Sequence, residues 1–165
     1  MARAAFRSPR SAFAHRRCLV AEQDGGILGQ IVRLPGSEWR RLRAGTGLVM
    51  LRAAGVGAGL RLLWRGPVEE RLMPPVRGDT LYVASLSVRP ENRGKGIGGQ
   101  LLQCAIDEAS GLGLRAVALD VAARNEGAIR FYRRHGFGVV EERRTPPRRG
   151  LPAGGSVRME LSLGA

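Results

Sequence analysis

The chain of 165 residues is 44% hydrophobic and has a formal net charge of +13. Its length and apolar content suit one globular domain over residues 1–165 and exclude a fibrous or largely disordered chain. The charge is carried by arginine, since Lys95 is the only lysine, and the arginines are scattered without interleaved aromatic residues. A general bias toward arginine explains this pattern better than a nucleic-acid surface, so nucleic acid is not the expected partner.

The first 17 residues contain arginines and serines but no acidic residue. Such a basic segment is typical of a transit peptide, of a short amphipathic helix that leads into a domain, or of a start site that has lost upstream sequence. We favour the amphipathic helix or the start site that has lost upstream sequence over the transit peptide. The longest apolar run, Gly47 to Trp64, contains Arg52 and Arg61, and because charges within a bilayer are costly we expect no membrane span.

The two cysteines, Cys18 and Cys104, are far apart in the sequence. Apart from His15, no Cys or His lies near either of them at metal-ligand spacing. The sequence therefore predicts no disulfide framework and no metal site, and a reducing, cytoplasmic location.

Two strand-forming runs, Cys18–Gln23 and Ile27–Leu34, flank an Asp-Gly-Gly turn and predict a β-hairpin. Between residues 37 and 73, leucines recur among arginines at helical spacing, and glycines divide the segment into short helices. We expect a helical insertion between strands. It is compatible with a lid over a substrate, with the contact face of a homodimer, or with packing against the sheet, which is the commonest outcome.

The stretch from Leu81 to Gly99 is expected to be a buried strand, stopped by Pro90, followed by a glycine-rich loop and a helix that begins near Gly98. A helix N-terminus offers unpaired N–H groups, glycines allow close approach to the backbone, and Arg93 and Lys95 add positive charge. These features favour a polyphosphate ligand.

Downstream, the apolar pattern predicts that the helix continues to about Ser110 and is followed by a buried strand, a second helix and two further strands. The strands on either side of the first helix should pair in parallel, as in a βαβ unit. His135 is expected to be a helix-end residue, not a base. The expected later elements are the strand Ala116–Val121, the helix from Asn125 to His135, and the strands Phe137–Arg143 and Val157–Leu163.

Two known glycine motifs fit this loop poorly. Gly94, Gly96 and Gly99 match the dinucleotide-binding pattern G-x-G-x-x-G, but residues 89–93 separate the strand from the first glycine, and too little chain follows for a second mononucleotide half. A P-loop is excluded because Lys95 is followed by Gly96, where a Ser or Thr is required.

A third pattern covers more of the chain. The sequence resembles the GCN5-related N-acetyltransferase (GNAT) superfamily, whose hallmark loop has an Arg or Gln, two residues, Gly, any residue, then Gly or Ala. The family also has V-x-P before this loop, N-x-x-A-x-x-x-Y and G-F after the next strand, and a last strand like R-M-E-L here. The resemblance spans residues 81–163. The matching positions are Val88, Pro90, Arg93, Gly96, Gly98, Asn125, Ala128, Tyr132, Gly136, Phe137 and Arg158 to Leu161.

This resemblance implies an α/β (α+β) fold with a mixed, mostly antiparallel central sheet, a splayed parallel strand pair and flanking helices. It also implies that acetyl-CoA binds as co-substrate between the splayed strands, Leu81–Val88 and Ala116–Val121, with no metal. The implied cofactor-binding residues are Leu86, Val88, Arg93, Gly94, Lys95, Gly96, Ile97, Gly98, Gly99, Asn125 and Tyr132.

By the same resemblance, Tyr132 is the general acid that protonates the departing thiolate, Asn125 binds the pantetheine arm, and the N–H of Val88 polarises the thioester carbonyl. Asp120 is the candidate base for the acceptor amine. An equally good interpretation makes Asp120 a strand carboxylate paired with an arginine, and Glu22 is a distant second candidate for the base.

The function implied is N-acetyltransferase, which transfers acetyl from acetyl-CoA to a primary amine of a small molecule or peptide by direct attack in a ternary complex. The alternatives are a non-catalytic acyl-CoA-binding module of this fold and a basic nucleic-acid-binding protein. The family's usual domain begins with a strand and two helices, whereas about 17 residues precede the hairpin here. We expect residues 37–73 to supply the missing wall of the acceptor site.

Overall fold

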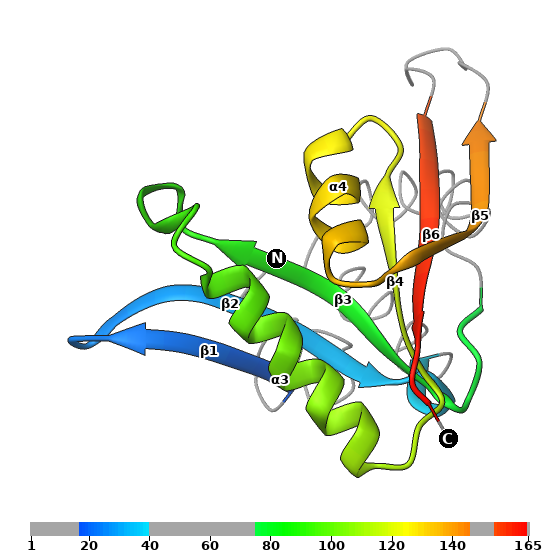
Figure 1. The fold of residues 1–165 in the computed structure, drawn as a ribbon, viewed down its shortest axis with the longest axis horizontal. Helices are drawn as coiled ribbons and strands as arrows, with labels where there is room; N and C mark the ends of the chain where they lie inside the picture. The colour runs from blue at the N-terminus through cyan, green and yellow to red at the C-terminus, as the bar shows by residue number, and fades with distance from the viewer. Residues whose placement is uncertain (1–16, 40–74, 146–153, 165) are drawn as a thin grey trace, which may run out of the picture.

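The computed structural model describes residues 17–39, 75–145 and 154–164, which form a six-stranded sheet in the order β1-β2-β3-β4-β6-β5 (Figure 1). Two longer helices, a helical segment at 36–39 and a short 3-10 turn, η2, also belong to this part of the chain. The predicted N-terminal segment and nearly all of the predicted helical insertion lie outside the described residues. The elements are β1 Cys18–Gln23, β2 Gly26–Pro35, β3 Thr80–Val88, η2 Pro90–Asn92, α3 Ile97–Gly111, β4 Ala116–Ala122, α4 Glu126–Arg134, β5 Gly138–Thr145 and β6 Gly154–Ser162.

The sheet is mixed, as predicted. β1 and β2 form the predicted antiparallel hairpin, whose turn places Asp24 and Gly25 at positive φ. β3 precedes α3 in the chain and β4 follows it, and these two strands pair in parallel. Every other neighbouring pair is antiparallel. Hairpin turns can join antiparallel strands, whereas parallel strands need a crossover, so the parallel pair occurs where the chain places a long helix between two strands.

The helices cover one face of the sheet, where α3 packs against β2 and β3 (Figure 1). Apolar residues three and four apart line the buried side of α3, as an amphipathic helix requires: Leu101, Leu102, Ala105 and Ala109. The opposite face carries a second, smaller cluster in which Trp39, from a helical segment at 36–39, contacts Tyr82 and Leu34. In the described part of the chain, no helix is both long and apolar enough to cross a bilayer.

The parallel pairing of β3 and β4 is short. It joins Thr80–Val83 to Ala116–Leu119 and then ends, although β3 stays paired with β2 as far as Val88 and β4 stays paired with β6 as far as Ala122. The two strands therefore diverge, and we call this point the fork. β3 is fully buried only before the fork, so the prediction of a strand buried along its whole length is wrong for its second half.

The last strand takes a position that chain order does not indicate. β6 lies between β4 and β5, so the strand that follows α4 forms the outer edge of the sheet. Residue 158 on β6 consequently faces both Asp120 on β4 and Glu141 on β5. The position of β6 between β4 and β5 therefore brings residues that are far apart in the sequence onto one surface.

Two glycines provide a test of the packing. A Cβ atom at Gly36 would overlap the carbonyl oxygen of Arg77, whereas a Cβ at Gly111, at the end of α3, would meet no atom within 4 Å. We expect Gly36→Ala to lower the free energy of unfolding by about 1–3 kcal/mol, the usual effect of overpacking. Gly111→Ala should leave it unchanged or slightly raised. Urea denaturation measures both, and equal stabilities of the two variants would contradict this packing.

Candidate functional site

Past the fork, β3 has a free edge on the side of β4. The N–H of Arg89, directly after β3, donates to the carbonyl of Leu28 in β2 over 2.9 Å, so it points toward β2. Because successive residues of a strand direct their backbone groups to opposite sides, Leu86 and Val88 direct theirs away from β2. β4 does not pair with β3 beyond Val83, so the N–H groups of Leu86 and Val88 are available to an extended ligand that would bind as an added strand.

The loop after β3 leads into an N-terminus of α3 that has no side-chain cap. Gly94 and Gly96 have φ of 78° and 81°, a conformation that favours glycine, and Gly96 is the N-cap of α3. A Cβ on either glycine would meet no atom within 4 Å, so the loop borders open space. The first-turn N–H groups of α3 therefore face a space that an anion can enter.

Two cations accompany this loop. Arg93 is exposed, and its Nε donates to the carbonyl of Val88 over 3.4 Å. Lys95 is also exposed, and its Nζ donates to Oδ1 of Asn92 over 3.0 Å. Both cations add positive potential at the helix N-terminus, but only Arg93 borders the cavity described below.

Helix α4 supplies the opposite wall. Asn125 is its N-cap, as predicted, and its Oδ1 accepts a hydrogen bond from the N–H of Ala128 over 3.1 Å. This bond leaves the amide NH₂ of Asn125 free to donate to a ligand. Tyr132 lies seven residues further along and therefore shares a face of α4 with Asn125.

Tyr132 is almost wholly buried, with 9% of its surface exposed. Its ring packs near Phe131 and Phe137, with centroids 5.2 Å and 5.8 Å away. Burial raises the pKa of the Tyr132 hydroxyl to about 12, because the charged phenolate is poorly solvated there. The phenol is therefore protonated at neutral pH and can act as a proton donor.

These walls enclose one cavity of about 770 Å³, within the range of small-molecule sites. It contains every predicted cofactor-binding residue except Lys95. The predicted residues that line it are Leu86, Val88, Arg93, Gly94, Gly96, Ile97, Gly98, Gly99, Asn125 and Tyr132.

Sequence reasoning missed several residues of this cavity. Three side chains from α4 and its C-cap line it: Phe131, Arg134 and His135. His135 is the C-cap of α4, a helix-end residue as expected, and its ring centroid lies 4.4 Å from that of Phe131. Phe131 lies three residues after Ala128, and Arg134 and His135 lie three and four residues after Phe131, so the helical period from the predicted position Ala128 was the signal that could have identified them. A Cβ at Gly99 would lie 2.9 Å from Nε2 of His135, which explains the glycine there.

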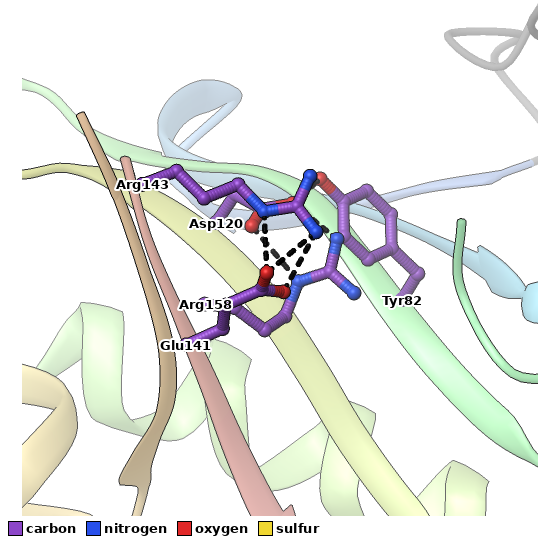
Figure 2. A network of polar contacts seen from close by, with 5 residues as sticks. All are labelled: Tyr82, Asp120, Glu141, Arg143 and Arg158. Atoms are coloured by element: carbon purple, nitrogen blue, oxygen red, sulfur yellow. Dashed lines mark hydrogen bonds and ion pairs between the residues drawn. The ribbon is translucent and has the colours of Figure 1, made fainter. Parts of the chain in front are cut away.

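Asp120, the candidate base, does not line the cavity. Its carboxylate accepts hydrogen bonds from Arg158, at 2.8 Å and 2.7 Å, and from the hydroxyl of Tyr82 at 2.9 Å (Figure 2). The side chains of Asp120 and Arg158 are only 3% and 6% exposed. This geometry favours the second interpretation of the sequence, a strand carboxylate paired with an arginine. Glu22, the other candidate, lies on β1 near the hairpin turn, also away from the cavity.

The raised pKa of Tyr132 makes stability depend on pH. The folded state binds the phenolic proton more tightly than the unfolded state, so this stabilisation is complete below about pH 10 and is lost as the pH rises through about 12. The difference in unfolding free energy between wild type and Tyr132→Phe should therefore fall by roughly 2 kcal/mol between about pH 9 and pH 12. Urea unfolding at several pH values measures this difference. If it does not change with pH, the phenol is not desolvated.

Comparisons with known proteins agree with this geometry. The profile of the acetyltransferase (GNAT) family matches residues 3–137. The chain is 40% identical over 63 residues to N-alpha-acetyltransferase 30 of Schizosaccharomyces pombe, covering 37% of this chain and 42% of that protein. It is 40% identical over 55 residues to an L-methionine sulfoximine/L-methionine sulfone acetyltransferase of Pseudomonas aeruginosa, covering 33% and 32%. The chain thus spans less than half the length of these curated relatives.

Solved structures show the same fold. A crystal structure described as an acetyltransferase matches with a TM-score of 0.67 and 21% identity over 98% of this chain and 77% of that one. A putative acetyltransferase from Salmonella typhimurium, solved with acetyl-CoA, matches with a TM-score of 0.58 and 21% identity over 90% and 65%. Because the family profile covers most of the sequence and the fold agrees, the chain belongs to the GNAT family of acetyltransferases.

Proposed function

We propose that the cavity binds acetyl-CoA and that the protein transfers the acetyl group to a primary amine of a small molecule or peptide, by direct attack in a ternary complex. One observation carries this proposal. A single cavity joins a free strand edge, an uncapped helix N-terminus and a buried, protonated tyrosine. Acetyl-CoA has a matching part for each of the three: amides in its pantetheine arm, a pyrophosphate, and a sulfur that leaves with a negative charge.

The residues present fit the molecule. The open space beside Gly94 and Gly96 leaves room for a pyrophosphate against the first-turn N–H groups of α3, with Arg93 beside it. The free edge at Leu86 and Val88 would pair with the pantetheine amides. The amide of Asn125, whose oxygen already caps α4, would donate to the same arm from the opposite wall.

Acetyl-CoA would supply the acetyl group as an activated thioester. The N–H of Val88 would donate to the carbonyl oxygen, where negative charge develops. Tyr132 would give its phenolic proton to the sulfur as the carbon–sulfur bond breaks and the amine nitrogen bonds to the acetyl carbon. The proton that the nitrogen loses would return to the phenol by way of solvent, so the reaction ends with a neutral tyrosine, an amide and a free thiol.

The acceptor must lose a proton before it attacks, because an ammonium group has no lone pair. Asp120 would do this only if it gave up its bonds to Arg158 and Tyr82, so we propose that water takes the proton and that Asp120 remains an ion-pair partner. The names of two relatives, an N-alpha-acetyltransferase and an acetyltransferase of two methionine derivatives, support an amine on a peptide or a small amino acid as the acceptor class.

The decisive assay is release of free CoA from acetyl-CoA with a panel of primary amines, including amino acids and short peptides. In the wild type we expect release of CoA that depends on the amine. In Tyr132→Phe the kcat should fall by at least about 100-fold, since a general acid typically contributes at least that factor. The Kd for acetyl-CoA should remain within about twofold, because the phenyl ring is retained.

Three outcomes would contradict the proposal in different ways. Binding of acetyl-CoA without release in the presence of any amine supports a non-catalytic acyl-CoA-binding module. Full turnover by Tyr132→Phe shows transfer but refutes Tyr132 as the proton donor. A protein retained on DNA in a salt-sensitive manner that acetyl-CoA does not reverse would support the nucleic-acid alternative.

A further inference from the structure

A buried polar network crosses three strands on the face of the sheet away from α3 and α4. Arg158 of β6 binds Asp120 of β4 through two hydrogen bonds, Nε to Oδ1 at 2.8 Å and Nη2 to Oδ2 at 2.7 Å. Tyr82 of β3 donates its hydroxyl to the same Oδ2 over 2.9 Å. Figure 2 shows these side chains meeting above the sheet, beside the Glu141–Arg143 pair of β5.

The network lies at the fork. The last backbone pair of β3 and β4 is Val83 with Leu119, and Asp120 is the next residue of β4. Tyr82 directly precedes Val83, so its hydroxyl reaches forward along the sheet to the first residue past the pairing. Arg158 is the residue opposite Asp120 on β6. The carboxylate is therefore held from both sides at the position where the backbone stops holding β3 to β4.

The network is also rigidly packed. Tyr82 is 1% exposed, its ring lies 4.3 Å from that of Trp39, and the guanidinium carbon of Arg158 lies 5.6 Å from its centroid. Burying an ion pair carries a desolvation cost that its attraction often fails to exceed, so such pairs are better explained by the geometry they fix than by stability. The geometry at this position is the separation of β3 and β4, whose pairing ends at Val83 and Leu119.

We propose that Tyr82, Asp120 and Arg158 set the opening of the fork, and thereby position the free edge at Leu86 and Val88 against the pantetheine arm. This inference rests on the proposed function. None of the three network residues lines the cavity, so all are positioning residues. The network should act on the arm, which would lie between the diverging strands, and not on the phosphates, which would lie at the N-terminus of α3.

The test compares two ligands in Tyr82→Phe, a variant that keeps the ring and its packing but removes the bond to Asp120. Isothermal titration calorimetry gives the Kd of acetyl-CoA and of adenosine 3′,5′-bisphosphate, which is the nucleotide half of CoA and lacks the arm. We expect acetyl-CoA to bind about five- to tenfold more weakly, the loss of roughly one hydrogen bond's contribution, and the nucleotide to bind within about twofold of wild type.

Glu108→Gln is the matched control. It disrupts an ion pair of 2.6 Å between Arg33 of β2 and Glu108 of α3. Arg33 pairs with Val83 beside the fork, but its ion pair lies on the α3 face of the sheet, opposite the network, so the ratio of the two Kd values should stay unchanged. Asp120→Asn separates positioning from catalysis. It should shift the ratio in the same direction as Tyr82→Phe, whereas a residue that acted only as the base would lower turnover and leave the ratio unchanged.

Each result is decisive. If the ratio of the two Kd values is unchanged in Tyr82→Phe, including the case in which both ligands bind equally more weakly, the positioning role is wrong. Binding of acetyl-CoA by the wild type would still support the proposed site. If wild type binds the nucleotide half but gains no affinity from the acetyl-pantetheine arm, both the positioning role and the proposed site are wrong. A shifted ratio in Tyr82→Phe together with an unshifted ratio in Glu108→Gln supports the inference.

Discussion

The parallel ladder between β3 and β4 ends after four residue pairs, and the candidate site depends on where it ends. A longer ladder would use the backbone groups of Leu86 and Val88 within the sheet and leave no edge for a ligand. β3 continues because β2 still pairs with it, and β4 continues because β6 pairs with it. The divergence is therefore held between two antiparallel ladders, without loss of strand structure on either side.

Most groups that would meet the cofactor belong to the backbone. The free edge of β3 and the first turn of α3 need only the right conformation, which Gly94 and Gly96 adopt at positive φ. Side chains would contribute at a few points that line the cavity: Asn125 at the start of α4, Arg93 at the loop, and Tyr132 further along α4. Such a division would place few demands on the sequence of the site, since hydrogen bonds of the backbone do not depend on the side chain.

What the sequence revealed was mostly local. The hairpin follows from its Asp-Gly-Gly turn, the start of α3 from its glycines, and the start of α4 from the cap at Asn125, because each depends on residues a few positions apart. The position of β6 and the partners of Asp120 could not be predicted in this way. Arg158 lies 38 residues from Asp120, and among so many arginines no local pattern marks the one that pairs with it. Lys95, predicted to bind phosphate, bonds Asn92 within its own loop and does not line the cavity.

In the proposed function, acetyl-CoA occupies the cavity formed by the free edge of β3, the N-terminus of α3 and α4. Amide chemical shifts in a ¹⁵N-labelled sample titrated with acetyl-CoA test it most directly. We expect large shifts for the N–H groups of Leu86, Val88, Gly96 and Gly98, and little change in the outer strands β1 and β5. Shifts confined to other surfaces, or no shift at saturating ligand, would contradict it.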